Sequence, residues 1–195
     1  MKGIRLLLAL VLSVSVSGSV LAAQGYQTPS SDLAALVDAK LAPSSYLSAD
    51  GQWLALFERK RVETLDDLAK EELKLAGIKL NPANFSRSRP RTKFSALQVK
   101  HIATGAVITV NNLPQGVIRS PKWSSNSEYL AFIVEQPTQA QLWVYNAETK
   151  QARQLSTVAL NSVLTATPYQ WLPDSTAIVA NQAVNLGKPK LVSDA

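Results

Sequence analysis

The sequence predicts a mainly β fold, because one hairpin pattern occurs three times along the chain and a second pattern occurs twice. In the first pattern a strand ends in a large apolar residue, an Asp or Asn with a small neighbour turns the chain, and another strand follows. Its copies begin at Leu47, Trp123 and Trp171, and the second pattern begins at Leu97 and Leu142. Together they predict a partial β-propeller of four-stranded antiparallel blades.

The spacing of the two patterns predicts where each blade lies. Residues 118–156 contain four short strands joined by turns, which matches the roughly 40 to 45 residues of one blade. The first blade is longer because an insertion separates its two hairpins. The incomplete propeller as a whole is predicted to cover residues 45–183, and residues 184–195 are a tail or truncation point. Within the propeller, the first blade covers 45–111 with its insertion at 61–93, the second blade covers 118–156, and the start of a third covers 168–181.

Two blades and the start of a third do not close a ring, since a propeller needs at least about four. Uncovered blade faces and strand edges recruit other chains. We therefore expect either a longer parent protein or a ring completed by another chain, with self-association through the open blade edges as a further possibility.

The N-terminus has the pattern of a secretory signal peptide, predicted to cover residues 1–23. Two cations, Lys2 and Arg5, precede an apolar run, and small residues close the segment at Ala22 and Ala23, where cleavage is expected. A transmembrane helix needs about 20 predominantly apolar residues, whereas serines dilute the second half of this one. A retained membrane anchor is the alternative. Export to the periplasm or the medium follows from the signal.

A short helix is predicted in the N-terminal segment, residues 24–44. Apolar residues between 32 and 39 recur at helical spacing, Ser31 can cap the first turn, and Pro43 breaks the pattern. This helix precedes the first blade.

The insertion is also predicted to be helical. Thr64 and Asp67 form a start that resembles a capping box, and an apolar pattern follows until Gly77 ends the helix. The Ser, Arg and Pro content of residues 83–93 then predicts an irregular, exposed loop.

Composition excludes several classes of function. The net charge of +6 comes from basic residues that are dispersed except at 59–61 and 87–93, and neither group accompanies a reading motif, so a nucleic-acid partner is not expected. The absence of cysteine excludes thiol catalysis, cysteine-ligated zinc and disulfides. We expect no cofactor, no metal and no membrane contact after signal cleavage.

The chain offers few candidate catalytic groups. His101 is the only histidine and lies at the end of a predicted strand, where a half-exposed structural position is the ordinary expectation. The carboxylates at 66–67 and 71–72 suit a helix start, and metal binding is a remote second interpretation. We predict no catalytic residue in this chain.

Arginines in the loop at the end of the insertion are the candidate substrate contacts. Arg87, Arg89 and Arg91, followed by Lys93, could hold an acidic side chain, because guanidinium binds carboxylate bidentately. The alternative is a solubilising loop.

Tryptophans recur at equivalent positions of the blades. The four are Trp53, Trp123, Trp143 and Trp171. Their recurrence predicts packing anchors between neighbouring blades rather than a platform for sugars or bases.

Four segments carry a resemblance to a known family: 72–82 with its Leu-Ala-Gly-Ile-Lys-Leu-Asn-Pro run, 120–124, 141–144 and 169–174. The chain resembles, over about residues 32–181, the N-terminal propeller of the prolyl oligopeptidase family of serine peptidases, and specifically its glutamyl-endopeptidase-like branch. It departs from the usual Asp-Gly blade turn at Asn126-Ser127 and Asp174-Ser175, and from the usual Gly-containing run at 83–87.

The resemblance implies a two-domain enzyme in which the propeller caps an α/β-hydrolase domain and screens peptide substrates. A Ser, Asp and His triad would then lie downstream, with its nucleophile on a Gly-x-Ser-x-Gly turn. No such spacing occurs in this sequence. We therefore expect a non-catalytic propeller fragment of an exported serine peptidase. The alternative is a periplasmic binding or scaffold module that completes its ring with another chain.

Overall fold

A computed structural model describes residues 28–60, 63–88, 92–165 and 167–184. The chain forms two compact units, one up to Ala39 and one from Lys40 onward. The predicted signal peptide, 1–23, lies outside the described residues. Within the described segments, no helix has the length and apolar character needed to span a bilayer.

The N-terminal unit contains the predicted short helix, α2 (Ser31–Asp38). Ser30 occupies the N-cap position without a side-chain capping bond, and Ser31 is itself the first helical residue. The Ser31 hydroxyl donates to the Asp32 carboxylate at 3.4 Å. The helix was therefore predicted correctly, whereas the capping role of Ser31 was wrong.

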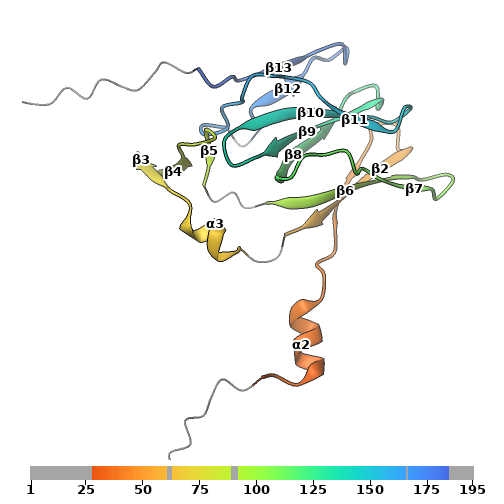
Figure 1. Ribbon diagram of the computed structural model, residues 1–195. Coiled ribbons are helices and arrows are strands. Elements are labelled where there is room, and N and C mark those ends of the chain that lie inside the picture. The colour runs from red at the N-terminus through yellow and green to blue at the C-terminus, as the bar shows by residue number, and fades with distance from the viewer. Residues whose placement is uncertain (1–27, 61–62, 89–91, 166, 185–195) are drawn as a thin grey trace, which may run out of the picture. The chain divides into compact units, whose positions relative to one another are not determined.

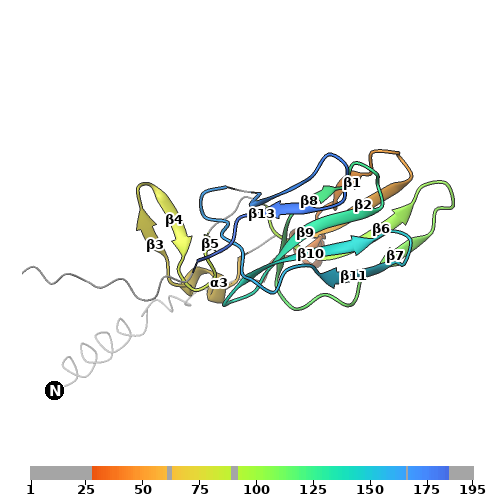
Figure 2. The same ribbon diagram turned by 90° about the horizontal axis from the view of Figure 1, so that it is seen from above.

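In the described part of the second unit, the regular secondary structure consists of antiparallel strands and one short helix, which confirms the mainly β prediction (Figures 1 and 2). We name three repeats by their strands. The first repeat contains β1 (Ser44–Leu47), β2 (Trp53–Arg59), β6 (Phe94–His101) and β7 (Val107–Thr109). The second repeat contains β8 (Val117–Trp123), β9 (Tyr129–Glu135), β10 (Ala140–Asn146) and β11 (Gln151–Gln154). The third repeat contains β12 (Tyr169–Trp171) and β13 (Ile178–Ala180). A single residue pair, Phe94 with Ile118, joins the sheets of the first two repeats.

The core lies on both faces of the second repeat. Alternate residues of β9, among them Phe132, pack with Phe57 and Leu97 of the first repeat. The intervening residues, among them Ile133, pack with Trp171 of the third. Because side chains alternate across a strand, a continuous apolar run fills both interfaces. Each large side chain that is fully buried there contributes about 1.5–3 kcal/mol.

The turn between the first two strands of each repeat is organised by a short polar side chain. The Ser48 hydroxyl donates to the Asp50 carboxylate at 2.6 Å and accepts from the Trp53 amide at 2.9 Å. In the second repeat Ser124 bonds to Asn126 at 2.7 Å, and it accepts from the amide five residues on. These local bonds explain why Asp and Asn recur in the turns.

Neighbouring turns are also bonded to one another. The Asp50 amide of the first repeat donates to the Ser127 hydroxyl of the second at 3.0 Å. The Asn126 amide of the second repeat donates to the Ser175 hydroxyl of the third at 3.1 Å. The turns of the first and second repeats therefore each donate a backbone N–H to a serine of the next repeat.

Hydrogen bonds from two tryptophan indole groups also connect successive repeats. Trp123 Nε1 donates to the Tyr46 carbonyl at 2.9 Å, and Trp171 Nε1 donates to the Lys122 carbonyl at 3.1 Å. Both bonds between the first and second repeats span 77 residues, and both bonds between the second and third span 49. The same relation is thus repeated between successive repeats.

These contacts explain how Ser is accommodated in two of the turns at the position that Gly51 occupies in the first repeat. Ser127 and Ser175 have φ of 63° and 62°, close to the 73° of Gly51 at the equivalent position of the first repeat. A left-handed conformation costs a non-glycine residue about 1–2 kcal/mol. The hydroxyl offsets this cost by satisfying the amide of the preceding turn.

The prediction that the insertion is helical was wrong for most of its length. Helix α3 covers only Leu65–Ala69, and a three-stranded sheet of β3 (Leu73–Leu75), β4 (Ile78–Asn81) and β5 (Ser86–Arg87) follows. Ala76 and Gly77 have φ of 48° and 80°, so Gly77 completes a hairpin turn rather than ending a helix. Apolar residues alternate on both sides of that turn, and this strand period prevails over the helical one.

The start of α3 was predicted correctly. Thr64 and Asp67 form a reciprocal capping box. The Asp67 carboxylate also pairs with Lys60 at 2.6 Å and with Lys70 at 2.7 Å. The hydrogen bonds from these two ammonium groups hold the pKa of Asp67 well below its usual range.

We predict that Ser127→Ala destabilises the protein by about 1–2 kcal/mol, because it leaves the part-buried Asp50 amide without its acceptor. Ser125→Ala, at an exposed position two residues earlier, is the matched control and should change stability by less than about 0.5 kcal/mol. Urea unfolding measures both variants. Equal effects would contradict the structural role of the turn-to-turn bond.

We predict that Asp67→Asn lowers the free energy of local unfolding of α3 at pH 7 by about 1 kcal/mol, since it removes two ion pairs. The folded-state pKa of Asp67 is depressed, so this stabilisation is fully present above the unfolded value of about 3.9 and is lost progressively as the pH falls from there through the much lower folded-state pKa. Amide exchange in α3 should therefore differ most between wild type and variant at pH 7, and the difference should be smaller at pH 3. Asp66→Asn, in the same helical turn, is the control.

Candidate functional site

A cavity of about 450 Å³ lies between the insertion and the second repeat. Its lining includes Lys60, Arg87 and Lys93 together with Asn84, Glu135 and Gln136. Cations and polar groups therefore gather here, at the place where the candidate arginines were predicted.

Arg87 is exposed and uses its guanidinium on the backbone. Its Nε donates to the Val163 carbonyl at 2.9 Å, and its Nη2 donates to the Leu164 carbonyl at 3.2 Å. Arg89 and Arg91 lie outside the described residues. Because a guanidinium has five N–H donors, Arg87 keeps donors for a further acceptor while it holds this loop.

Lys93 and Lys60 have carboxylate partners. The Lys93 ammonium pairs with Glu63 at 2.7 Å, and Lys60 pairs with Asp67. These pairs neutralise much of the positive charge of the cavity, so its electrostatic attraction for an anion is weaker than the count of cations suggests.

The segment around Asn84 is more ordered than the exposed loop predicted from its composition. The Asn84 side-chain amide donates to the Gln136 carbonyl at 3.0 Å, and its oxygen accepts from the Ser86 hydroxyl at 2.6 Å. The Phe85 carbonyl accepts from the Ser162 amide at 2.9 Å. Asn84 and Ser86 are buried, so the prediction of an exposed, irregular loop was wrong here. The composition was misleading because the tertiary bonds satisfy these polar groups.

Sequence reasoning missed a buried ion pair at the edge of this cavity. Arg119 of β8 pairs with Glu135 at the end of β9, and both side chains are less than 10% exposed. Burial raises the pKa of the Glu135 carboxyl, while the Arg119 guanidinium opposes that shift. The available signal was Glu135, the one charged residue of β9, which ends an otherwise largely apolar strand.

Gly116 also borders the cavity and cannot be replaced without movement. A Cβ at this residue would lie 2.5 Å from the Glu135 carbonyl oxygen and 3.0 Å from a methyl group of Val134. The close approach of β8 to β9 therefore requires glycine here.

His101 has structural partners. Its Nδ1 lies 3.0 Å from the Thr104 hydroxyl, and its ring packs edge-on against Trp53 with centroids 4.7 Å apart. In the described part of the chain, no group of three or more His, Asp or Glu residues could hold a metal ion.

The tryptophans pack in the cores as predicted. Trp53, Trp123 and Trp143 lie against the core between the first two repeats, and Trp171 belongs to the core between the second and third. Trp123 and Trp171 also connect successive repeats through their indole N–H groups.

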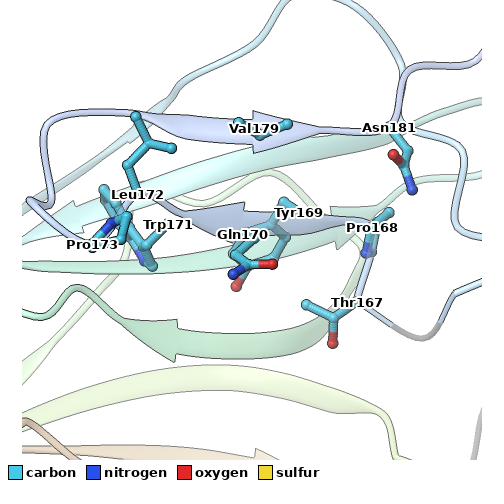
Figure 3. A pocket seen from close by; sticks show the side chains of 9 residues that line it. All are labelled: Thr167, Pro168, Tyr169, Gln170, Trp171, Leu172, Pro173, Val179 and Asn181. Atoms are coloured by element: carbon cyan, nitrogen blue, oxygen red, sulfur yellow. The ribbon is translucent and has the colours of Figure 1, made fainter.

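A second cavity, of about 370 Å³, lies on the outer face of the third repeat (Figure 3). Gln170 of β12 and Val179 of β13 line it, and Leu172 lies at the start of the turn between these strands. Val179 is 63% exposed, so this face is open to solvent in the described chain.

No protein-family model matches the chain, but known proteins similar to it were found. A protein named "Probable glutamyl endopeptidase, chloroplastic" from Oryza sativa subsp. japonica is 27% identical over 183 residues, which cover 86% of this chain and 19% of that protein. The protein of the same name from Arabidopsis thaliana is 25% identical over 178 residues, which cover 85% and 18% respectively.

A solved structure described as a dipeptidyl aminopeptidase IV from Bacteroides ovatus ATCC 8483 aligns with 18% identity and a TM-score of 0.42 over 71% of this chain and 20% of that one. The chain spans about a fifth of the length of the curated relatives it matches. It is therefore a relative of part of the glutamyl endopeptidases, which confirms the resemblance predicted from its motifs.

Proposed function

We propose that this chain is the non-catalytic, propeller-forming part of an exported serine peptidase, in which it controls the access of peptides to an α/β-hydrolase domain. The observation that supports this proposal best is the repeated pair of bonds between successive turns, at spans of 77 and 49 residues. Such repetition is what blades that follow one another around a ring require. The curated relatives are named as glutamyl endopeptidases, which supports peptide as the substrate class.

The absence of a Gly-x-Ser-x-Gly turn from the sequence supports a non-catalytic role. His101, bonded to Thr104 and packed on Trp53, has partners that do not form a triad. Chemistry would then come from a hydrolase domain outside these 195 residues, and the signal-like N-terminus supports export of the whole.

A second candidate is a periplasmic binding or scaffold module that completes its ring with another chain. The open face of the third repeat favours it, because Val179 there is largely exposed. The nucleotide sequence after the codon for Ala195 separates the two candidates. An open frame with further repeats and a Gly-x-Ser-x-Gly turn supports the peptidase, and a stop codon followed by an unrelated gene supports the module.

Arg87, with Arg89 and Arg91, is proposed to contact an acidic side chain of the substrate. Its exposed guanidinium lies beside the cavity at the insertion. The bonds from Arg87 to the Val163 and Leu164 carbonyls would hold it in place for that contact.

We predict that the 195-residue chain neither reacts with a fluorophosphonate nor cleaves peptides after glutamate, because its sequence contains no Gly-x-Ser-x-Gly turn to present a serine nucleophile. Gel-based labelling and a fluorogenic peptide assay measure the two properties, with an active serine peptidase as positive control. Labelling that a single Ser→Ala substitution abolishes would refute the non-catalytic assignment.

We predict that replacing Arg87, Arg89 and Arg91 by Ser raises the KM of a peptidase containing this chain about tenfold for a peptide cleaved after Glu, because a charge-assisted hydrogen bond is lost. A peptide with Gln at the same position should be affected much less. Lys74→Ser, on the exposed β3 of the insertion, is the control for a general loss of charge. Equal changes for both peptides would rule out recognition of the acidic group.

A further inference from the structure

We propose that the insertion is a lid over the polar cavity of about 450 Å³, and that this lid opens while the repeats stay folded. The lid comprises residues 63–88, which contain α3 and the separate sheet of β3, β4 and β5 (Figure 2). Asp67 and Ser86 are among the lid residues that line the cavity, and Gly116 and Glu135 line it from the second repeat. Opening would give a polar ligand access to the cavity. The proposal does not depend on the peptidase role.

The first step of the argument is that the lid shares no apolar core with the repeats. No residue from 63 to 88 belongs to either hydrophobic core. The buried residues in this range are polar, Asn84 and Ser86. Leu65 and Leu75 are 84% and 67% exposed while the lid is closed. Opening therefore exposes little new apolar surface, and the hydrophobic effect does little to oppose it.

The second step is that polar bonds from one short segment, which we name the latch, hold the lid against the loops of the second repeat. The latch runs from Asn84 to Arg87. The Asn84 side-chain amide donates to the Gln136 carbonyl at 3.0 Å, and the Phe85 carbonyl accepts from the Ser162 amide at 2.9 Å. Arg87 donates to two carbonyls of the loop after β11. Water can satisfy each of these groups once they separate, so every bond has only a small net free energy.

The third step is that the lid has its own internal bonds, which opening does not break. The Asn84 side-chain oxygen accepts from the Ser86 amide at 3.2 Å and from the Ser86 hydroxyl at 2.6 Å. The capping box of Thr64 and Asp67 is local, and β3, β4 and β5 pair only with one another among the described strands. The latch and the lid therefore keep their shape when the bonds to the second repeat are lost.

The lid remains attached at its base to the first repeat. The Lys60 amide donates to the Lys93 carbonyl at 3.0 Å, next to the pair of Arg59 with Phe94 that ends the β2–β6 ladder. The register of this ladder shifts between Glu58 and Arg59, so a bulge lies at the base. A body that is anchored on one repeat and latched to another by polar bonds is suited to local opening.

Amide hydrogen exchange, followed by NMR on the full chain, reports on the latch. The acceptor of the Ser162 amide is the Phe85 carbonyl, which belongs to the lid. The neighbouring amides of Leu160 and Asn161 donate to carbonyls outside the lid. The Ser162 amide should therefore exchange faster than these two neighbours, since lid opening releases it alone.

Asn84→Asp is the variant that weakens the latch. It removes the donor to the Gln136 carbonyl and keeps an oxygen for Ser86. It should speed exchange of the Ser162 amide about tenfold and leave the Asn161 amide unchanged. Arg87→Ala weakens the other end of the latch and should speed exchange of the same amide.

Asn81→Asp is the matched control for this variant. It adds the same charge to the lid and keeps the oxygen that accepts from the Ala83 amide at 2.9 Å. The exchange of the Ser162 amide should not change.

A single thiol measures access to the cavity itself. The chain contains no cysteine, so Ser88→Cys supplies the one thiol in the protein. Ser88 lines the cavity, and its Oγ is buried without a hydrogen-bond partner in the described chain, so the substitution removes no bond. A water-soluble thiol reagent should react slowly with this variant, and about tenfold faster when Asn84→Asp is added. Adding Asn81→Asp instead should leave the reaction slow.

Circular dichroism checks that each variant is folded, and the chain unfolded in urea gives the limiting rate of thiol labelling. Three results would each overturn the proposal. They are a folded Asn84→Asp variant whose Ser162 amide exchanges no faster, an equal acceleration of the Ser162 and Asn161 amides, and a Ser88→Cys thiol whose labelling Asn84→Asp does not accelerate.

Discussion

Strand β9 is buried on both of its faces, and the arrangement of the rest of the second unit depends on this constraint. Its even-numbered residues complete the core with the first repeat, and its odd-numbered residues complete the core with the third. A strand with two apolar faces cannot be stable at the surface, since each large side chain left in water forfeits about 1.5–3 kcal/mol. Neighbouring repeats on both sides are therefore a requirement of the sequence of β9.

Burial alone does not fix how one repeat sits on the next, because apolar contacts are not directional. The turn-to-turn and indole bonds supply the direction. They join backbone groups of one repeat to side chains of the next, and the two bonds of each interface share one offset, so a slip of one residue would break both at once. The left-handed conformations of Ser127 and Ser175 are the local cost of this alignment.

The insertion is also connected to distant segments by hydrogen bonds. Asn84 bonds to the loop after β9 and Arg87 bonds to the loop after β11, while Ser86 bonds to Asn84. These residues line a polar cavity beside the second repeat. Arg119 and Glu135 pair at its edge in a buried position, where losing one partner would leave an uncompensated charge. The described lining of the cavity is therefore held in part by hydrogen bonds and by a buried ion pair.

The sequence by itself determined the mainly β class and the positions of the turns, because Asp or Asn before a small residue favours a turn whatever surrounds it. It also determined the capping box of Thr64 and Asp67, whose bonds are local. It was misleading between Lys70 and Gly77, where a helical spacing and a strand spacing competed and tertiary context decided for the hairpin.

Only the tertiary structure decided why Ser127 and Ser175 replace glycine, since their partners lie 77 and 49 residues away. The burial of Asn84 and the pairing of Arg119 with Glu135 have the same origin. Each depends on groups brought together from distant segments, and local residue preferences contain no information about such partners.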